Sequence, residues 1–192
     1  MKIHPYLNFT NPNIIKAKIF HPFNSHLSVN HNASIKIGDY YQGGLVFYVD
    51  HTGKHGLIAA PEDQSNQIQW YNGTYVSIRA DSFGMGLSNT KKIILKSGKG
   101  YYAASACQDL TIGDYNDWYL PSKNELQLMH QTIGHGASNE LTNIGNFADA
   151  WYWSSTEGGL YLAWNQCFGK KGVEGNFGSK FYMGYVRAIR AF

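Results

Sequence analysis

The segment "DWYLPSKNELQLMHQTIG" constrains the fold more than any other part of the chain. Pro121 disfavours helical backbone at Leu120 and favours an extended approach to the corner. Ser122 is followed by Glu125 at the spacing of a capping box, which predicts that a helix begins after Ser122. Apolar residues then recur at helical intervals up to Gly134, which predicts the end of the helix. The segment therefore predicts a short strand that turns sharply into a helix of about three turns.

Before this corner the sequence predicts a β-hairpin followed by short elements. Two strands, 45–49 and 56–60, are separated by a turn sequence. The stretch "IQWYNG" predicts another short strand that ends in an Asn-Gly turn. A helix is expected with Ser88 or Asn89 as its cap and Gly98 as its stop. The spacing of apolar residues in "YYAASACQDL" predicts a second short helix.

After the corner the chain becomes strand-like again. The runs 151–157, 160–168 and 180–192 are rich in aromatic and β-branched residues, and Gly-, Asn- and Lys-rich loops separate them. We expect the last strand to pair with the first hairpin. A hairpin, then helices, then strands is the order of an α+β fold with short antiparallel sheets, two to three short helices and long loops.

The charge of the chain is distributed unevenly and divides it into two parts. Residues 1–36 carry four lysines and no acidic residue, and their apolar residues have no clear periodicity. We expect 1–36 to be a flexible or loosely docked N-terminal extension and 37–192 to be one domain. Residues 37–192 contain 12 basic and 13 acidic side chains, so the domain is nearly neutral. This balance argues against a nucleic-acid partner.

Two cysteines and the hydropathy of the chain bear on its compartment. Cys107 and Cys167 form neither a metal-binding motif nor a CxxC redox pair. Two alternatives remain open for them, one disulfide in an exported protein or two buried thiols. No apolar run approaches the ~20 residues of a membrane-spanning helix. The N-terminus has no continuous apolar stretch of the kind found in a secretory signal.

The sequence contains no recognisable catalytic or metal-binding constellation. Ser154, Ser155 and Thr156 offer hydroxyl groups, but no histidine or aspartate is placed to activate one of them. Glu62 and Asp63 adjoin without the alternating acidic loop that calcium requires. The glycine-rich pieces "GMG" and "GGL" lack the lysine of a phosphate-binding loop. We therefore expect no enzyme activity, no catalytic residue, no metal site and no cofactor.

The loop "FGKKGVEGNFGSK" between the last strands is the best candidate for a ligand-binding surface. It combines lysines with four glycines and is flanked by aromatic residues. Charge attraction and ring stacking together suit an anionic polysaccharide. An ordinary solvated hairpin loop is the alternative interpretation. The residues expected to bind the ligand are Trp164, Lys170, Lys171, Lys180 and Tyr182.

Six segments of 37–192 resemble a bacterial domain family of unknown function, typified by the C-terminal domain of the Legionella collagen-like adhesin. They are, in order, "IGDYYQGGLVFYVD", "HGLIAAPEDQS", "SNT", "DWYLPSKNEL", "YWSSTE" and "YVRAIRAF". More distantly, the corner and the final "VRAIR" look like the C-type-lectin-like fold. That resemblance implies that Trp118, Leu120 and Pro121 belong to the scaffold of the domain rather than to a binding site.

The resemblance also implies a function. The adhesin domain is a trimer that binds sulfated glycosaminoglycans and contributes to attachment. By resemblance we expect a non-catalytic module outside the cell or at its surface, which binds carbohydrate in adhesion and forms a homotrimer. The alternative is a protein-binding or assembly module, such as a receptor-binding tip, without affinity for glycans.

Overall fold

The structure is a computed structural model that describes residues 34–80, 84–169 and 175–192. The chain from Ser34 to Phe192 forms one compact unit. It combines short helices with mainly antiparallel sheets, so the expected α+β class is confirmed. The expectation of a flexible or loosely docked extension at 1–36 lies outside the described residues, apart from its last three.

One sheet has four antiparallel strands in the order β1-β2-β3-β9. The expected hairpin is formed by β2 and β3, and β9 pairs with β3 so that Ala59 lies opposite Ile189. The expected pairing of the last strand with the first hairpin is therefore confirmed, and it joins the two ends of the domain in one sheet. The strands are β1 (Tyr40–Tyr41), β2 (Gly44–Val49), β3 (Gly56–Ala59) and β9 (Ile189–Ala191).

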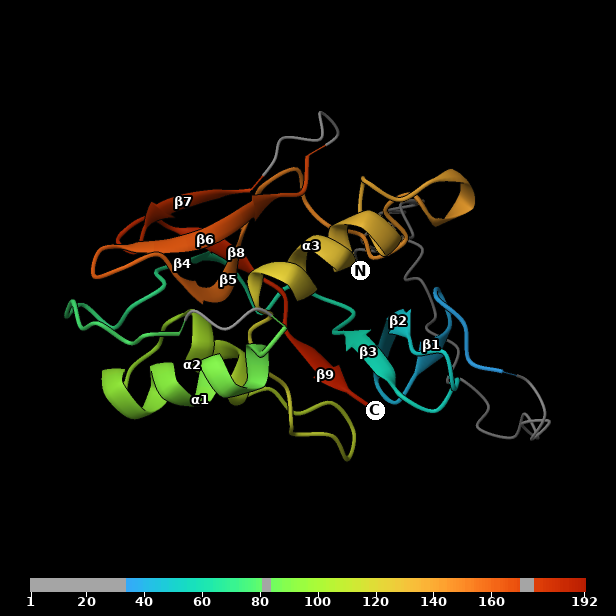
Figure 1. Cartoon of the computed structure of the whole chain (residues 1–192), viewed down its shortest axis with the longest axis horizontal. Helices are drawn as coiled ribbons and strands as arrows, with labels where there is room; N and C mark the ends of the chain where they lie inside the picture. The colour runs from blue at the N-terminus through green and yellow to red at the C-terminus, as the bar shows by residue number, and fades with distance from the viewer. Residues whose placement is uncertain (1–33, 81–83, 170–174) are drawn as a thin grey trace, which may run out of the picture. The chain divides into compact units, whose positions relative to one another are not determined.

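The other sheet has five strands in the order β4-β8-β5-β6-β7 (Figure 1). All neighbouring strands in this sheet are antiparallel except β5 and β8, which are parallel and pair at Tyr152 and Tyr185. The strands are β4 (Ser65–Ile68), β5 (Trp151–Glu157), β6 (Leu162–Cys167), β7 (Asn176–Ser179) and β8 (Gly184–Val186).

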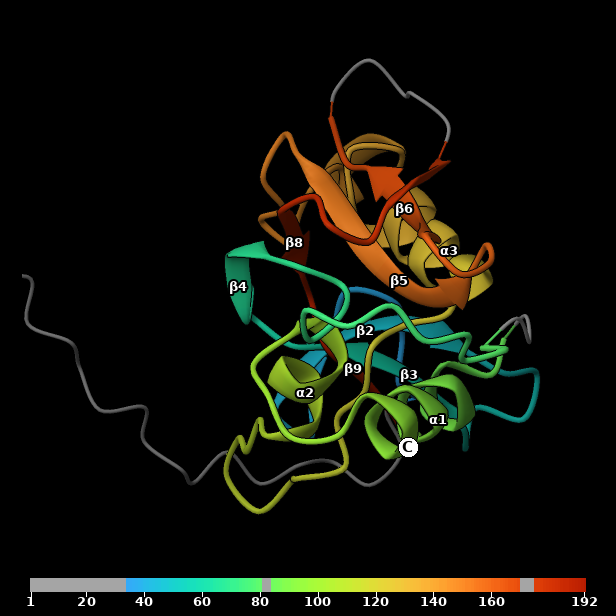
Figure 2. The same ribbon diagram turned by 90° about the vertical axis from the view of Figure 1, so that its left-hand side faces the viewer.

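Three α-helices and one short 3-10 helix, η1, complete the described part of the chain. The helix α3 contacts β2 of one sheet and β5 and β6 of the other, and so connects the two sheets (Figure 1). The helices α1 and α2 pack against each other, and α1 also contacts β5 (Figure 2). The helices are α1 (Gly86–Ser97), α2 (Ala103–Gln108), α3 (Lys123–Ile133) and η1 (Asn139–Leu141).

The corner before α3 has the predicted geometry. The backbone N–H of Ser122 donates to the Glu125 carboxylate at 2.7 Å, and the Ser122 hydroxyl accepts from the backbone N–H of Glu125 at 3.5 Å. The predicted capping box is therefore confirmed. Trp118 and Leu120 are 2% and 0% exposed. Their burial confirms that they belong to the scaffold.

Two hydrophobic clusters hold the elements together. The first surrounds the buried rings of Trp70, Trp118 and Trp153, and packs α1 and α2 against the five-stranded sheet. The second surrounds Tyr152 and Phe168 and lies beneath α3. The aromatic residues that make the chain unusual are thus divided between core packing and exposed positions.

Several predicted boundaries were wrong. α1 begins at Gly86, and neither Ser88 nor Asn89 caps it. The expected loop between the last strands contains β7. The run 180–192 is not one strand, because β8 ends at Val186 and β9 begins at Ile189. Between them the buried guanidinium of Arg187 donates to Asp63 and to the carbonyls of Ala60 and Gly145. The chain thereby passes from β8 in one sheet to β9 in the other.

The remaining expectations concern the thiols and the membrane. Cys107 and Cys167 are free, so of the two alternatives the structure contains the unpaired thiols. Cys107 is fully buried, whereas Cys167 is partly exposed. Among the described residues, no helix has the length and apolar character needed to cross a membrane.

Candidate functional site

Lys180 is a buried structural residue and not the surface cation that the sequence predicted. Its side chain is 1% exposed, and its ammonium group lies 2.5 Å from a carboxylate oxygen of Glu157. The same group donates to the carbonyl of Leu160 at 2.9 Å and lies 4.6 Å from the centre of the Trp70 ring. Burial lowers the pKa of Lys180, and the contact with Glu157 opposes this effect. The prediction that Lys180 contacts a ligand is therefore wrong.

Glu157 explains why a lysine is buried here. Its carboxylate accepts the backbone N–H groups of Ile78 at 3.0 Å and Arg79 at 2.6 Å. The Glu157–Lys180 pair therefore ties the segment that precedes α1 to the end of β5 and to the turn after β7. A buried carboxylate with a cation and two N–H donors has its charge compensated.

The Trp164 ring packs between the side chains of Phe177 and Lys123. The edge of Phe177 meets its ring at a centroid distance of 5.1 Å and an interplanar angle of 82°. The ammonium group of Lys123 lies 3.6 Å from the centre of the same ring. Trp164 is thus half-buried between α3 and β7, and it does not line the groove described next. The predicted contacts Lys170 and Lys171 lie outside the described residues.

Tyr182 lines a groove of about 670 Å³ beside β6 and β7. The groove is formed by the first residue of β5, by side chains of β6 and β7, and by the turn between β7 and β8. Its volume lies within the range of small-ligand sites. The residues that matter for its chemistry are Trp151, Asn165, Asn176, Ser179, Tyr182 and Met183.

The polar part of the groove centres on Asn165. This residue pairs with Trp153 across β5–β6 and with Asn176 across β6–β7. The side-chain oxygen of Asn165 is buried and has no hydrogen-bond partner among the described residues. A β-carbon at Gly178 would lie 2.7 Å from the Asn165 side-chain nitrogen, so glycine leaves the space that this amide occupies. An unpaired buried acceptor is costly, and a ligand O–H or N–H would satisfy it.

Exposed apolar side chains form the walls of the groove. Trp151 is 38% exposed, Tyr182 is 62% exposed and Met183 is 61% exposed. None of the described residues that line the groove carries a charge. Aromatic rings beside amide and hydroxyl groups can stack on the C–H face of a sugar while its hydroxyls form hydrogen bonds.

Reasoning from the sequence identified Tyr182 but missed Trp151 and Asn165. Trp151 and Trp153 lie two residues apart on β5 and so point to the same face, yet Trp153 is buried and Trp151 is exposed. The alternation of side chains along β5 cannot distinguish the two tryptophans, because their difference in burial arises from elements distant in sequence. The position of Trp151 at the beginning of the strand was the only local signal.

Several histidine and cysteine side chains outside the groove are buried or half-buried. Among the described residues, no three histidine, cysteine or acidic side chains lie close enough to hold a metal ion. Burial raises the pKa of the Cys107 thiol, which makes it a poor nucleophile. His130 packs edge-on against Phe168 with a centroid distance of 5.0 Å, and its side-chain Nε2 is buried without a partner in the part of the chain that the structure describes. His135 donates from Nδ1 to the Phe168 carbonyl at 2.6 Å.

The fold and the groove define a mixed α+β domain with an uncharged, aromatic-walled site. Comparison of the chain with models of known protein families found no match, and a search of curated proteins also found none. The interpretation of function therefore depends on the geometry of the groove and on the sequence resemblance described above.

Proposed function

We propose that this chain is a non-catalytic carbohydrate-recognition module whose ligand binds in the groove beside β6 and β7. The observation that carries the proposal is the unpaired side-chain oxygen of Asn165 in a groove that the exposed rings of Trp151 and Tyr182 also line. A saccharide offers both features that this arrangement needs, an apolar C–H face and hydroxyl donors.

The groove takes an uncharged sugar unit. Its described lining has no cation, and Lys180, which the sequence offered as a contact for an anionic polysaccharide, is engaged with Glu157 in the interior. A sulfated or otherwise anionic ligand would depend on Lys170 and Lys171, which lie outside the described residues. Binding in the groove itself should then change little with salt, because no screened charge contributes.

The proposal includes the family and the architecture that the sequence resembles. The six ordered segments support membership of the adhesin-type family, and with it C-type-lectin-like architecture and a place outside the cell or at its surface. The buried corner at Trp118 and the pairing of β9 with β3 are consistent with that architecture, in which the corner joins strand to helix.

A glycan array containing neutral and sulfated saccharides tests the proposal. The purified chain should bind at least one neutral saccharide. Trp151→Ala and Tyr182→Ala should each weaken this binding at least about fivefold, since the sugar ring loses a stacking partner worth on the order of 1 kcal/mol or more. Tyr40 is 66% exposed on β1 and does not line the groove, so Tyr40→Ala is the matched control. Absence of binding to every saccharide would refute the proposal.

A protein-binding module is the second candidate, and one observation favours it. The residues around the turn after β7 expose several large apolar side chains in addition to the groove walls, and Tyr161 and Phe181 are 58% and 57% exposed. The backbone N–H of Lys180 donates to the carbonyl of Tyr161, so the two segments adjoin. Exposed apolar surface of this kind is typical of protein contacts.

The oligomeric state distinguishes the two candidates. If the surface around Tyr161 and Phe181 is a subunit contact, light scattering should detect a trimer that dissociates on dilution. Phe181→Ser should abolish that trimer, whereas Tyr40→Ser should not. A trimer without glycan binding favours the assembly role, and glycan binding by a monomer favours the carbohydrate role.

A further inference from the structure

A second surface, on the helix α1, combines positive charge with exposed apolar side chains. The helix contains no acidic residue, and it carries Lys91, Lys92 and Lys96, with Lys99 just beyond its end. Two leucines of the helix, Leu87 and Leu95, are exposed by 43% and 85%. Met85, which precedes the helix, is 50% exposed. Leu95 has the largest exposed fraction among the large apolar side chains that the structure describes.

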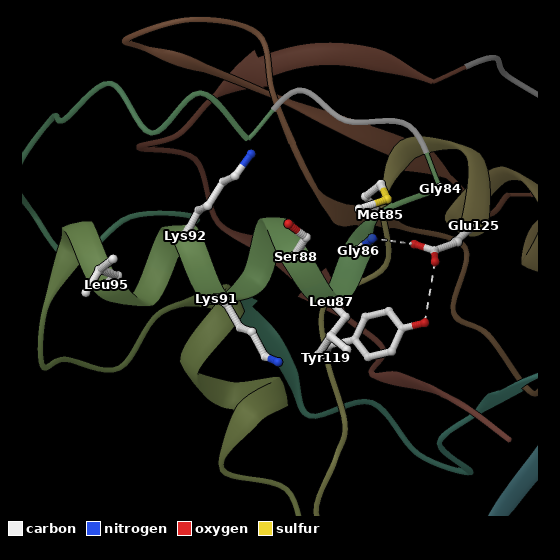
Figure 3. A pocket seen from close by; sticks show the side chains of 10 residues that line it. All are labelled: Gly84, Met85, Gly86, Leu87, Ser88, Lys91, Lys92, Leu95, Tyr119 and Glu125. Atoms are coloured by element: carbon white, nitrogen blue, oxygen red, sulfur yellow. Dashed lines mark hydrogen bonds between the residues drawn. The ribbon is translucent and has the colours of Figure 1, made fainter.

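The spacing of these residues gives the surface its pattern. Leu87, Lys91 and Leu95 are four residues apart, so they form one row along the helix. The side chains of Lys91 and Lys92 point to opposite sides of α1 (Figure 3). Leu87 and Leu95 therefore have lysine ammonium groups on both sides of them along the helix surface.

The lysines on one side of the helix are held by the neighbouring segment. The ammonium group of Lys96 donates to the carbonyl of Ser77 at 3.0 Å, and that of Lys92 lies 3.5 Å from the carbonyl of Arg79. Both contacts are with neutral acceptors, and among the described residues no acidic side chain forms an ion pair with either lysine. A cationic edge is thereby fixed along α1.

Nearby acidic side chains do not neutralise this surface. Glu125 lies at the beginning of α1 in a hollow of about 500 Å³, but its carboxylate accepts the Gly86 N–H and the Tyr119 hydroxyl (Figure 3). Asp109 lies at the other end, in a hollow that Leu95 and Lys99 also line. Two carboxylates beside four lysines leave the described face of the helix with a net positive charge.

We propose that this face of α1 binds an anionic lipid surface. The leucines would enter the boundary between headgroups and acyl chains, while the lysines, whose stems are apolar, would reach the lipid phosphates. Charge complementarity selects an anionic partner, and the exposed leucines select a lipid over other polyanions, because a polysaccharide or nucleic acid offers no apolar interior for them. Each lysine near such a surface strengthens binding about fivefold.

Sedimentation with lipid vesicles tests this proposal. The full chain should sediment with vesicles of phosphatidylcholine mixed with an equal amount of phosphatidylglycerol, and not with vesicles of phosphatidylcholine alone. Added salt should weaken the binding, because it screens the lysines. Failure to sediment with the mixed vesicles would overturn the proposal.

Two double variants separate the contributions of charge and apolar insertion. Lys91→Glu with Lys99→Glu should reduce binding to the mixed vesicles by at least about 25-fold, two lysines at about fivefold each. Leu87→Ser with Leu95→Ser should reduce it at least about tenfold, since two exposed leucines no longer enter the lipid. Lys54 is exposed in the turn between β2 and β3 and does not belong to α1. Lys54→Glu reverses the charge of this lysine and should retain most of the binding.

The leucine variant gives the decisive result. If it binds the mixed vesicles as well as the unchanged chain does, α1 is a general polyanion surface and the lipid proposal is wrong. Circular dichroism and the thermal midpoint of each variant should match those of the unchanged chain, because the four substituted side chains are exposed.

Discussion

The ammonium group of Lys180 lies 2.5 Å from the carboxylate of Glu157, and the two side chains are 1% and 4% exposed. Together they connect the turn after β7, the end of β5 and the segment before α1. Each charge would be unfavourable in the interior without the other, so the pair holds these three segments in contact.

Removal of one partner of this pair should destabilise the domain. Lys180→Met leaves Glu157 buried without its cation, and we expect the free energy of unfolding to fall by about 3–5 kcal/mol. Urea denaturation followed by tryptophan fluorescence measures this change. Lys54→Met removes an exposed lysine and should change stability by less than about 0.5 kcal/mol. A loss below about 1 kcal/mol for Lys180→Met would show that the pair is not structurally required.

The helix α3 should depend on its cap. The Ser122 hydroxyl accepts from the Glu125 N–H and from the Gly84 N–H, so Ser122→Ala leaves two donors without a partner. We expect a loss of about 1–2 kcal/mol in the free energy of unfolding. Ser77 is exposed in the segment before α1, and Ser77→Ala is the matched control with little expected effect. Equal stabilities for the two variants would contradict the role of the capping box.

The outcome at these residues illustrates what the sequence can and cannot predict. The capping box and the hairpin were predictable because their signals are local, Ser122 with Glu125 in one case and a turn between two apolar runs in the other. The burial of Lys180 was not predictable in the same way. Its partner Glu157 is 23 residues away, and no local pattern distinguishes it from a solvated lysine.

The groove was only partly predictable for a similar reason. Its floor depends on the register of β6 with β7, which places Asn165 opposite Asn176. The strand β7 has the sequence "NFGS", which lacks the alternation of a typical strand and was therefore assigned to a loop. Tyr182 was identified because it flanks the lysine- and glycine-rich loop in the sequence, which requires no knowledge of that register.

His130 should make the stability depend on pH. Burial, with a smaller contribution from His135, lowers the pKa of His130 in the folded state below its ordinary value of 6.5. As the pH falls below about 6.5, the unfolded chain therefore takes up a proton before the folded chain does, and stability is lost. Urea midpoints at pH 7.5 and pH 5.5, about one pH unit either side of that value, should differ for the unchanged chain.

Substitution of His130 isolates this effect. His130→Gln cannot be protonated, so its urea midpoint should change less between the two pH values than that of the unchanged chain. His51 is exposed, and His51→Gln should retain the full pH dependence. An unchanged pH dependence in His130→Gln would assign the effect to other groups.

Gly178 should control access to the floor of the groove. In Gly178→Ala the new β-carbon would lie 2.7 Å from the Asn165 side-chain nitrogen and displace that amide. We expect saccharide affinity to fall about tenfold, equivalent to about 1.4 kcal/mol, because the acceptor of Asn165 moves away from the ligand. Isothermal titration calorimetry measures the affinity, and an unaltered thermal midpoint would separate the effect from unfolding. Undiminished affinity would mean that Asn165 does not contact the ligand.

Nuclear magnetic resonance titration tests the central claim, that the groove beside β6 and β7 binds carbohydrate, most directly. The strongest neutral saccharide from the array would be added to ¹⁵N-labelled protein. The indole N–H of Trp151, the side-chain amide of Asn165 and the backbone N–H of Tyr182 should shift together with one dissociation constant, while the indole N–H of buried Trp118 should not move. Shifts confined to residues outside the groove, or no shift with any saccharide, would contradict the claim.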